Sequence, residues 1–149
     1  NENKFTKRKN INKPNGDILT VSFMPFGETY EKDCLGQSNP DPSNTGAKIV
    51  NSYFVQKGQL MCRGSGNSRP QPIAEAVDNM QVLYGVDTDD PSDGFVNQYL
   101  DADAINAKGS STWSKVVSIQ VALLINSIDN VKDVAPGAGN EDQFNLLGQ

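Results

Sequence analysis

Short stretches in which apolar and polar residues alternate predict a chain built mainly of β-strands. Residues 18–24 alternate in this way and are rich in β-branched and aromatic side chains, and Pro25 ends the stretch. Residues 47–56 and 59–63 are also strand-like and are separated by Lys57-Gly58, a pair suited to a tight turn. They predict a β-hairpin.

The clearest strand covers residues 113–127 and follows a segment whose periodicity is ambiguous. Residues 73–86 fit both helical and strand spacing, so we assign a strand to about residues 80–86 and leave the part before it open. Residues 99–108 predict a short loop or helical turn. Trp113 is expected to start the last strand as a core or edge anchor. The apolar residues on one face of that strand are Val117, Ile119, Val121 and Leu123.

An acidic turn follows the strand at residues 80–86 and carries the candidate ligands for a metal ion. Aspartates crowded this closely cost folding energy unless water or a cation screens them, and calcium prefers several oxygens from one glycine-hinged loop. Two interpretations stay open, a solvated turn and a calcium site. The expected calcium ligands are Asp87, Asp89, Asp93 and Asn97.

The chain contains only two cysteines, Cys34 and Cys62, and both lie in polar, glycine-flanked surroundings. Residues 26–46 predict a long loop that includes Cys34, and the hairpin brings Cys62 back beside it. We therefore predict a disulfide that closes this loop, as in proteins of oxidising compartments. The alternative is two unrelated free thiols.

Length and composition fit one soluble domain with a core, since the chain has 149 residues of which 36% are hydrophobic. No run is long and apolar enough to span a membrane, and no signal peptide is present, as expected for a mature or trimmed piece. A net charge of -5 argues against nucleic acid as the default partner. We expect residues 1–16 to be a basic arm or truncated connection and residues 17–149 to be one β-rich globular domain.

The residue types present do not favour catalysis. The chain has no histidine, which removes the commonest general base and the usual partner of a nucleophilic serine or cysteine. The glycine-rich residues 64–68 lack the lysine of a phosphate-binding loop and predict an ordinary loop. We expect no catalytic residues, no small-molecule substrate and no required cofactor.

Several segments together resemble the C-terminal half of PilW-type minor pilins of type IV pili. They are IAEAVDNMQVLYGVDTD (residues 73–89), NQYLDADAI (97–105) and WSKVVSIQVALLINS (113–127). DCLG at residues 33–36 and QLMCRG at residues 59–64 resemble that family's cysteine pair. The resemblance covers about residues 17–127, and related patterns occur in the J-type minor pseudopilins of type II secretion.

The resemblance implies an α+β, pilin-like fold with a mostly antiparallel sheet and a long N-terminal helix that this chain lacks. It also implies a structural subunit that contributes to assembly or to the tip complex of a pilus. The implied partners are other minor pilins and the major pilin. The implied location is the inner membrane facing the periplasm before assembly, and the extracellular pilus afterwards. An adhesin, a DNA-uptake module and a minor pseudopilin are the alternative functions.

The acidic turn departs from the family pattern, which commonly reads DTDGDG. Asp87 and Asp89 are kept, but the next residues lengthen the turn before Asp93-Gly94. Counted from Asp89 as an EF-hand-like loop, Asp93 and Asn97 occupy ligand positions and Pro91 occupies another. Asp87 or Asp101 would have to supply the missing oxygen.

Overall fold

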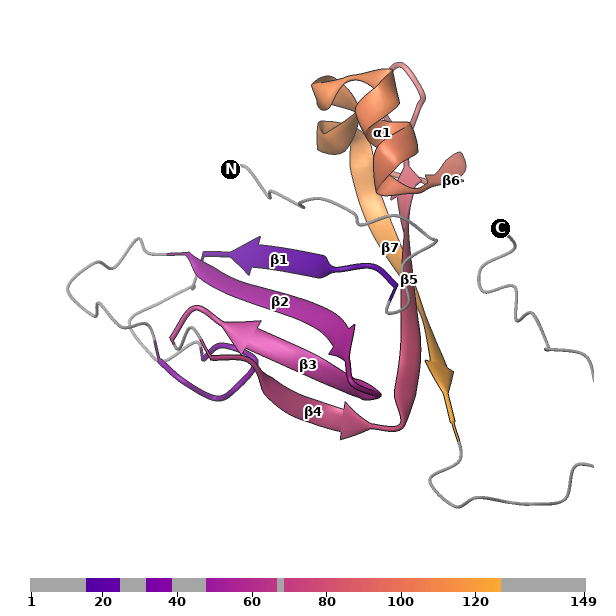
Figure 1. Ribbon diagram of the computed structural model, residues 1–149. Coiled ribbons are helices and arrows are strands. Elements are labelled where there is room, and N and C mark those ends of the chain that lie inside the picture. The colour runs from indigo at the N-terminus through magenta and orange to yellow at the C-terminus, as the bar shows by residue number, and fades with distance from the viewer. Residues whose placement is uncertain (1–15, 25–31, 39–47, 67–68, 127–149) are drawn as a thin grey trace, which may run out of the picture.

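The protein is described from a computed structural model that places residues 16–24, 32–38, 48–66 and 69–126. Most of the predicted arm at residues 1–16, much of the loop at residues 26–46, and residues 127–149 lie outside the described residues. The elements, shown in Figure 1, are β1 (Leu19–Phe23), β2 (Ile49–Gln56), β3 (Gln59–Gly64), β4 (Gln71–Glu75), β5 (Val77–Val86), β6 (Gln98–Leu100), α1 (Ala102–Lys108), the 3-10 helix η1 (Ser110–Lys115) and β7 (Val116–Ile125).

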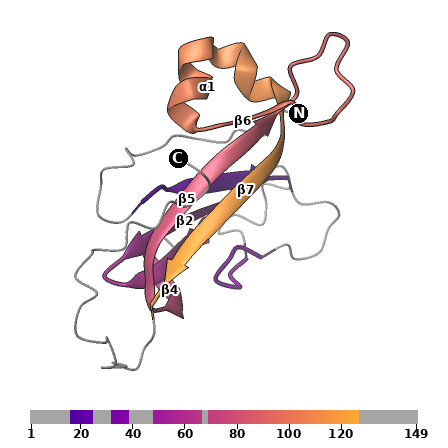
Figure 2. The same cartoon turned by 90° about the vertical axis from the view of Figure 1, so that its right-hand side faces the viewer.

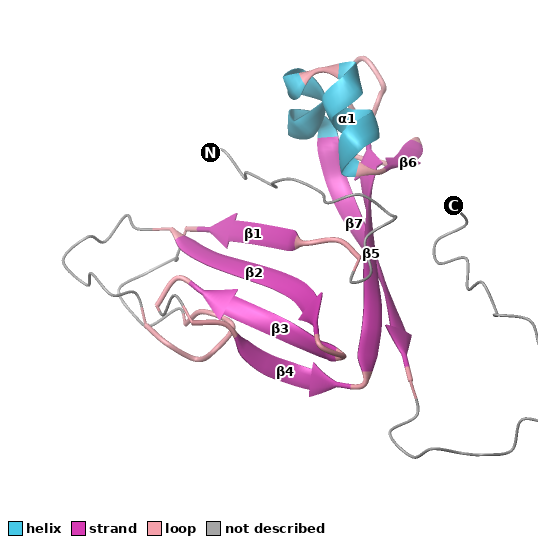
Figure 3. Cartoon of the chain, in the orientation of Figure 1, coloured by secondary structure: helices cyan, strands magenta, loops and turns pink. Residues whose placement is uncertain are grey.

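The strands form two antiparallel sheets. One has the order β1-β2-β3-β4 and the other has the order β6-β5-β7. In Figure 1 the long strand β5 stands across the four strands of the first sheet, and Figure 2 shows β5 and β7 side by side in front of that sheet. The helices gather at one end of the second sheet (Figure 3). The predicted α+β class with mostly antiparallel strands is confirmed.

The core lies where the first sheet faces β5. β5 supplies half of the buried cluster because its apolar residues face the first sheet at one end and the helices at the other. The buried cluster consists of Leu19, Val55, Val77, Met80, Val82, Tyr84, Val86, Leu100, Ala102 and Ile105. Packing in the core therefore sets the position of β5, and β5 in turn sets the position of the acidic loop that begins at its end.

The predicted hairpin is confirmed as β2 and β3. Lys57 and Gly58 both have positive φ, 54° and 72°, as a two-residue type I′ turn requires. The strand predicted at residues 18–24 is β1, and the helical turn predicted within residues 99–108 is α1. Asp101 caps α1 by accepting a hydrogen bond from the Ala104 N–H.

The ambiguous segment at residues 73–86 is extended except at Ala76, so its helical alternative is wrong. β4 and β5 meet at Ala76, whose φ of 57° turns the chain from one sheet into the other. The corner is fixed by two backbone hydrogen bonds, from Val77 N–H to the Gly58 oxygen and from Asn126 N–H to the Ala76 oxygen. Backbone pairing of β5 with β7 outweighs the helical spacing of the apolar residues in this segment.

The predicted start of the last strand is also wrong, because Trp113 lies in η1 and β7 begins at Val116. Trp113 is nevertheless an anchor. Its ring packs edge-on against Tyr84 at 5.0 Å between centroids, and its Nε1–H donates to Asn106 Oδ1. Val117 falls in a bulge, since Gly85 pairs with Ser118 and Val86 with Val116.

Candidate functional site

The acidic turn is the loop between β5 and β6, and Asp87 begins it. Asp87 is only 1% exposed although it is charged. Its N–H donates to the Lys115 oxygen, so the start of the loop is tied to the end of η1. The end of β5 thus places Asp87 in a buried position, whereas residues 88–95 of the loop are exposed to solvent.

The Asp87 carboxylate organises the loop around itself. Its Oδ1 accepts the Asp89 N–H at 3.0 Å, and its Oδ2 accepts the Gly94 N–H at 2.7 Å and the Ser92 hydroxyl. Gly94 has a φ of 80°, which suits glycine, and this turn directs its N–H back to Asp87. The Ser92 hydroxyl and the Gly94 N–H lower the pKa of the Asp87 carboxyl below its ordinary value despite burial, which acts in the opposite direction.

Asn97 closes the other end of the loop. Its Oδ1 accepts the Thr88 N–H at 2.7 Å, its Nδ2 donates to Asp89 Oδ2 at 3.0 Å, and its own N–H donates to the Val86 oxygen. The side-chain amide therefore spans the loop from one strand to the next. Through the hydrogen bond from its Nδ2, Asn97 holds the Asp89 carboxylate in place.

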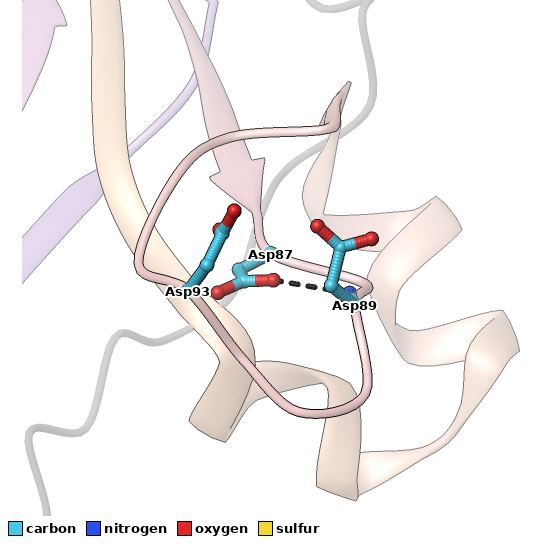
Figure 4. A group of neighbouring side chains, drawn as sticks. All are labelled: Asp87, Asp89 and Asp93. Carbon is cyan, nitrogen blue, oxygen red and sulfur yellow. Dashed lines mark hydrogen bonds between the residues drawn. The ribbon is translucent and has the colours of Figure 1, made fainter.

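The three predicted aspartate ligands come together, as Figure 4 shows. One oxygen each of Asp87, Asp89 and Asp93 lies within 4.8 Å of the others, a spacing that one cation can bridge. Asp89 and Asp93 are exposed, whereas Asp87 is buried and its carboxylate already accepts hydrogen bonds from the loop. The geometry is compatible with a calcium ion, and calcium binding stays a prediction.

The predicted disulfide between Cys34 and Cys62 is confirmed, with 6.4 Å between the Cα atoms. It ties the turn at residues 32–38 to β3. Asn51 on β2 supports the same contact, because its Oδ1 accepts the Cys34 N–H at 3.0 Å. Cys62 is fully buried, which protects the bond from reductants.

Asp33, which sequence reasoning did not single out, holds the disulfide turn from inside. Its Oδ1 accepts the N–H groups of Leu35 and Gln37, and its Oδ2 accepts the N–H of Gly66 at 2.8 Å. Burial raises the pKa of Asp33, but the three backbone donors outweigh burial and lower it below the ordinary value. Asp33 is 6% exposed, so a buried charge joins the turn to the end of β3.

The glycine-rich residues predicted as an ordinary loop make room for Asp33. A Cβ at Gly64 would lie 2.1 Å from Asp33 Oδ2, and one at Gly66 would lie 2.9 Å from it. The glycines at these two positions therefore serve the packing of a carboxylate. An aspartate directly before a cysteine, with glycines flanking the second cysteine, is the signal that sequence reasoning missed.

Asp17 is a second buried acid that the sequence did not reveal. Its N–H donates to the Met80 oxygen at 2.7 Å, and its Oδ2 accepts the Val82 N–H at 2.9 Å. Burial, assisted by the charge of Asp17, raises the pKa of Tyr84 to about 12. Asp17 thus joins the segment before β1 to the middle of β5.

Comparison with known proteins identifies the family. The family model described as type IV pilus-assembly protein W matches residues 45–149, which include β2 through β7, the disulfide partner Cys62 and the acidic loop. No curated protein and no solved structure matches the chain. In the part of the chain that the structure describes, no helix has the length and apolarity needed to cross a membrane. Since the match extends over most of the chain, the protein belongs to the PilW family of type IV pilus-assembly proteins.

Proposed function

We propose that the chain is the globular part of a structural minor pilin that contributes to the assembly or the tip complex of a type IV pilus. The observation that carries the proposal is the family match over residues 45–149. Asp17 joins the segment before β1 to β5 of the second sheet, and a disulfide with a buried Cys62 ties the turn at residues 32–38 to β3. Such crosslinking suits a domain that must persist outside the cell.

The same proposal covers partners, location and chemistry. Other minor pilins and the major pilin are the partners, and the full-length form faces the periplasm from the inner membrane before it enters the pilus. The role is non-enzymatic, since the chain contains no histidine and the described carboxylates with shifted pKa values, Asp33 and Asp87, accept hydrogen bonds from backbone N–H groups. Both acids have a lowered pKa, which is unsuited to proton donation at neutral pH.

Deletion of the gene for the full-length protein tests the proposal directly. We expect fewer surface pili, counted by electron microscopy, and loss of pilus-dependent behaviour. Complementation with the wild type and with Asp90→Asn, an exposed position in the acidic loop, should restore both. Normal pilus numbers in the deletion strain contradict the proposal. A secretion defect with normal pili assigns the protein to the pseudopilins.

A DNA-uptake role is the second candidate, and the basic arm favours it. Five lysines and arginines lie within the first fifteen residues, namely Lys4, Lys7, Arg8, Lys9 and Lys13. Binding of DNA through this arm should weaken steeply with salt and disappear when the five residues are changed to glutamine. An absence of DNA binding at low salt removes this candidate.

A further inference from the structure

Asp93 and Gly94 form the one Asp-Gly pair in the sequence, and the pair lies in the exposed part of the acidic loop, where water reaches it. Glycine has no side chain to shield its own nitrogen. Apart from its neighbours in the chain, none of the described residues lies within 4 Å of the place that a Gly94 Cβ would occupy. The Asp93 carboxyl carbon is therefore open to attack by the Gly94 nitrogen without steric hindrance from a side chain at residue 94.

The reaction open to an Asp-Gly pair is intramolecular. The Gly94 nitrogen attacks Asp93 Cγ, and the Gly94 N–H proton and the hydroxyl of the protonated carboxyl leave as water, which closes a cyclic succinimide. Water then opens the ring. Cleavage of the new Cγ–N bond restores aspartate. Cleavage of the bond between the Asp93 carbonyl carbon and the nitrogen gives isoaspartate, in which the main chain runs through Cγ and the former main-chain carbonyl becomes the side-chain carboxylate.

The folded loop opposes this reaction by holding both reacting groups. Gly94 N–H donates to Oδ2 of the buried Asp87 at 2.7 Å. Asp93 Oδ1 accepts the N–H of Phe95 at 2.9 Å, which fixes the carboxylate on the nitrogen that follows Gly94. Attack requires Gly94 to rotate its peptide plane and to lose its proton, and the charge-assisted hydrogen bond to Asp87 opposes both. The loop must therefore open locally before the succinimide can form.

We propose that Asp93-Gly94 is a site of spontaneous isoaspartate formation, and that the hydrogen bond from Gly94 N–H to Asp87 protects this site while the loop is folded. Isoaspartate adds a methylene to the main chain between residues 93 and 94. It therefore displaces Gly94 from Asp87, and it moves the carboxylate of residue 93 out of the group that it forms with Asp87 and Asp89 in Figure 4. Reclosing the loop does not reverse the change. This modification extends beyond the proposed function and does not depend on it.

The first test incubates the whole 149-residue chain below its melting temperature and counts isoaspartate at residue 93 by mass spectrometry that separates the two isomers. A synthetic peptide of residues 86–98 gives the rate for the open loop. We expect the chain to react more slowly than the peptide by about tenfold or more, and Asp87→Ala to raise the rate in the chain by a similar factor, because a hydrogen bond to a charged acceptor is lost. Asp90→Ala is the matched control, since it removes an exposed aspartate of the same loop and should leave the rate unchanged. Circular dichroism verifies that both variants are folded.

The second test keeps Asp87 and therefore holds even if Asp87→Ala fails to fold. Asp93→Asn presents an amide to the same Gly94 nitrogen, so ring closure releases ammonia and the hydrolysed product is detected by its mass. Deamidation of Asn15, which also precedes a glycine, falls in a different tryptic peptide. We expect residue 93 to deamidate more slowly in the folded chain than in the matching peptide. Equal rates in chain and peptide, a slower reaction in Asp87→Ala, an equal increase in Asp90→Ala, or no isoaspartate in any sample would overturn the proposal.

Discussion

Removal of the Cys34–Cys62 disulfide should destabilise the domain strongly, and the structure allows the size of the effect to be worked out. The two cysteines are 28 residues apart in sequence. In the chain-entropy model, a crosslink over a loop of this length removes unfolded-state entropy worth about 3–4 kcal/mol. The double variant Cys34→Ala/Cys62→Ala is therefore expected to lose about this much free energy of unfolding.

The loss of stability can have two causes, and the hydrogen bonds of the same turn allow them to be distinguished. Asp33 and Asn51 hold the turn through hydrogen bonds that exist only in the folded state, whereas the disulfide acts mainly on the unfolded chain. If this division is correct, Asp33→Asn should lower stability by a similar amount with or without the disulfide. A large coupling energy between the two changes would mean that the disulfide chiefly positions the turn.

Urea unfolding followed by circular dichroism measures both quantities, and thiol labelling of the unfolded, unreduced protein verifies the crosslink. We expect no reactive thiol in the wild type. Asp90→Asn, in the acidic loop, is a control that should leave stability unchanged within about 0.5 kcal/mol. Full thiol labelling, or a double-alanine variant as stable as the wild type, would refute the reasoning.

The remaining predictions concern three titratable or ligand-binding groups. Calcium should raise the melting temperature by several degrees more than magnesium at equal ionic strength, and Asp89→Ala should remove the difference; equal shifts would indicate screening alone. The folded-state pKa of Asp33 is lowered, so its contribution to stability is present above the unfolded pKa of about 4 and is lost as pH falls through the lower folded value. Urea midpoints across this acidic range should fall less in Asp33→Asn than in Asp90→Asn, and parallel curves would contradict this. One of the four tyrosines should ionise near pH 12 in an ultraviolet titration, and Asp17→Asn should lower that value, since burial and the Asp17 charge raise the pKa of Tyr84 to about 12.

Features that depend on neighbours in sequence were predictable. The hairpin at β2 and β3 follows from a two-residue turn between alternating strands, and both turn residues adopt the positive φ that the turn needs. The disulfide follows from a cysteine count of two and from the return of the hairpin. The family match over residues 45–149 confirms the resemblance to PilW proteins.

Features that depend on distant partners were not predictable from local pattern. Asp17 accepts from a backbone N–H 65 residues away, and Asp33 from one 33 residues away. Before folding, both look like ordinary polar residues of a loop, since nothing nearby indicates the backbone donors that bury them. Trp113 was misassigned for a similar reason, because its packing against Tyr84 decides its position and its strand-like surroundings do not.

The acidic loop shows why crowded charges alone do not determine a metal site. The sequence argument assumed that water or a cation must screen the aspartates, but the structure supplies hydrogen-bond donors from the loop itself. Asp87 receives two backbone N–H groups and a hydroxyl, while Asp89 and Asp93 remain exposed to water. The loop's own donors therefore offset part of the cost of the buried Asp87 charge, and we expect a cation to add stability to the loop without being required for its fold. It follows that the chain treated with a chelator should keep its β-sheet circular dichroism, whereas Asp87→Ala, which removes the acceptor of all three donors, should lower the melting temperature with or without calcium.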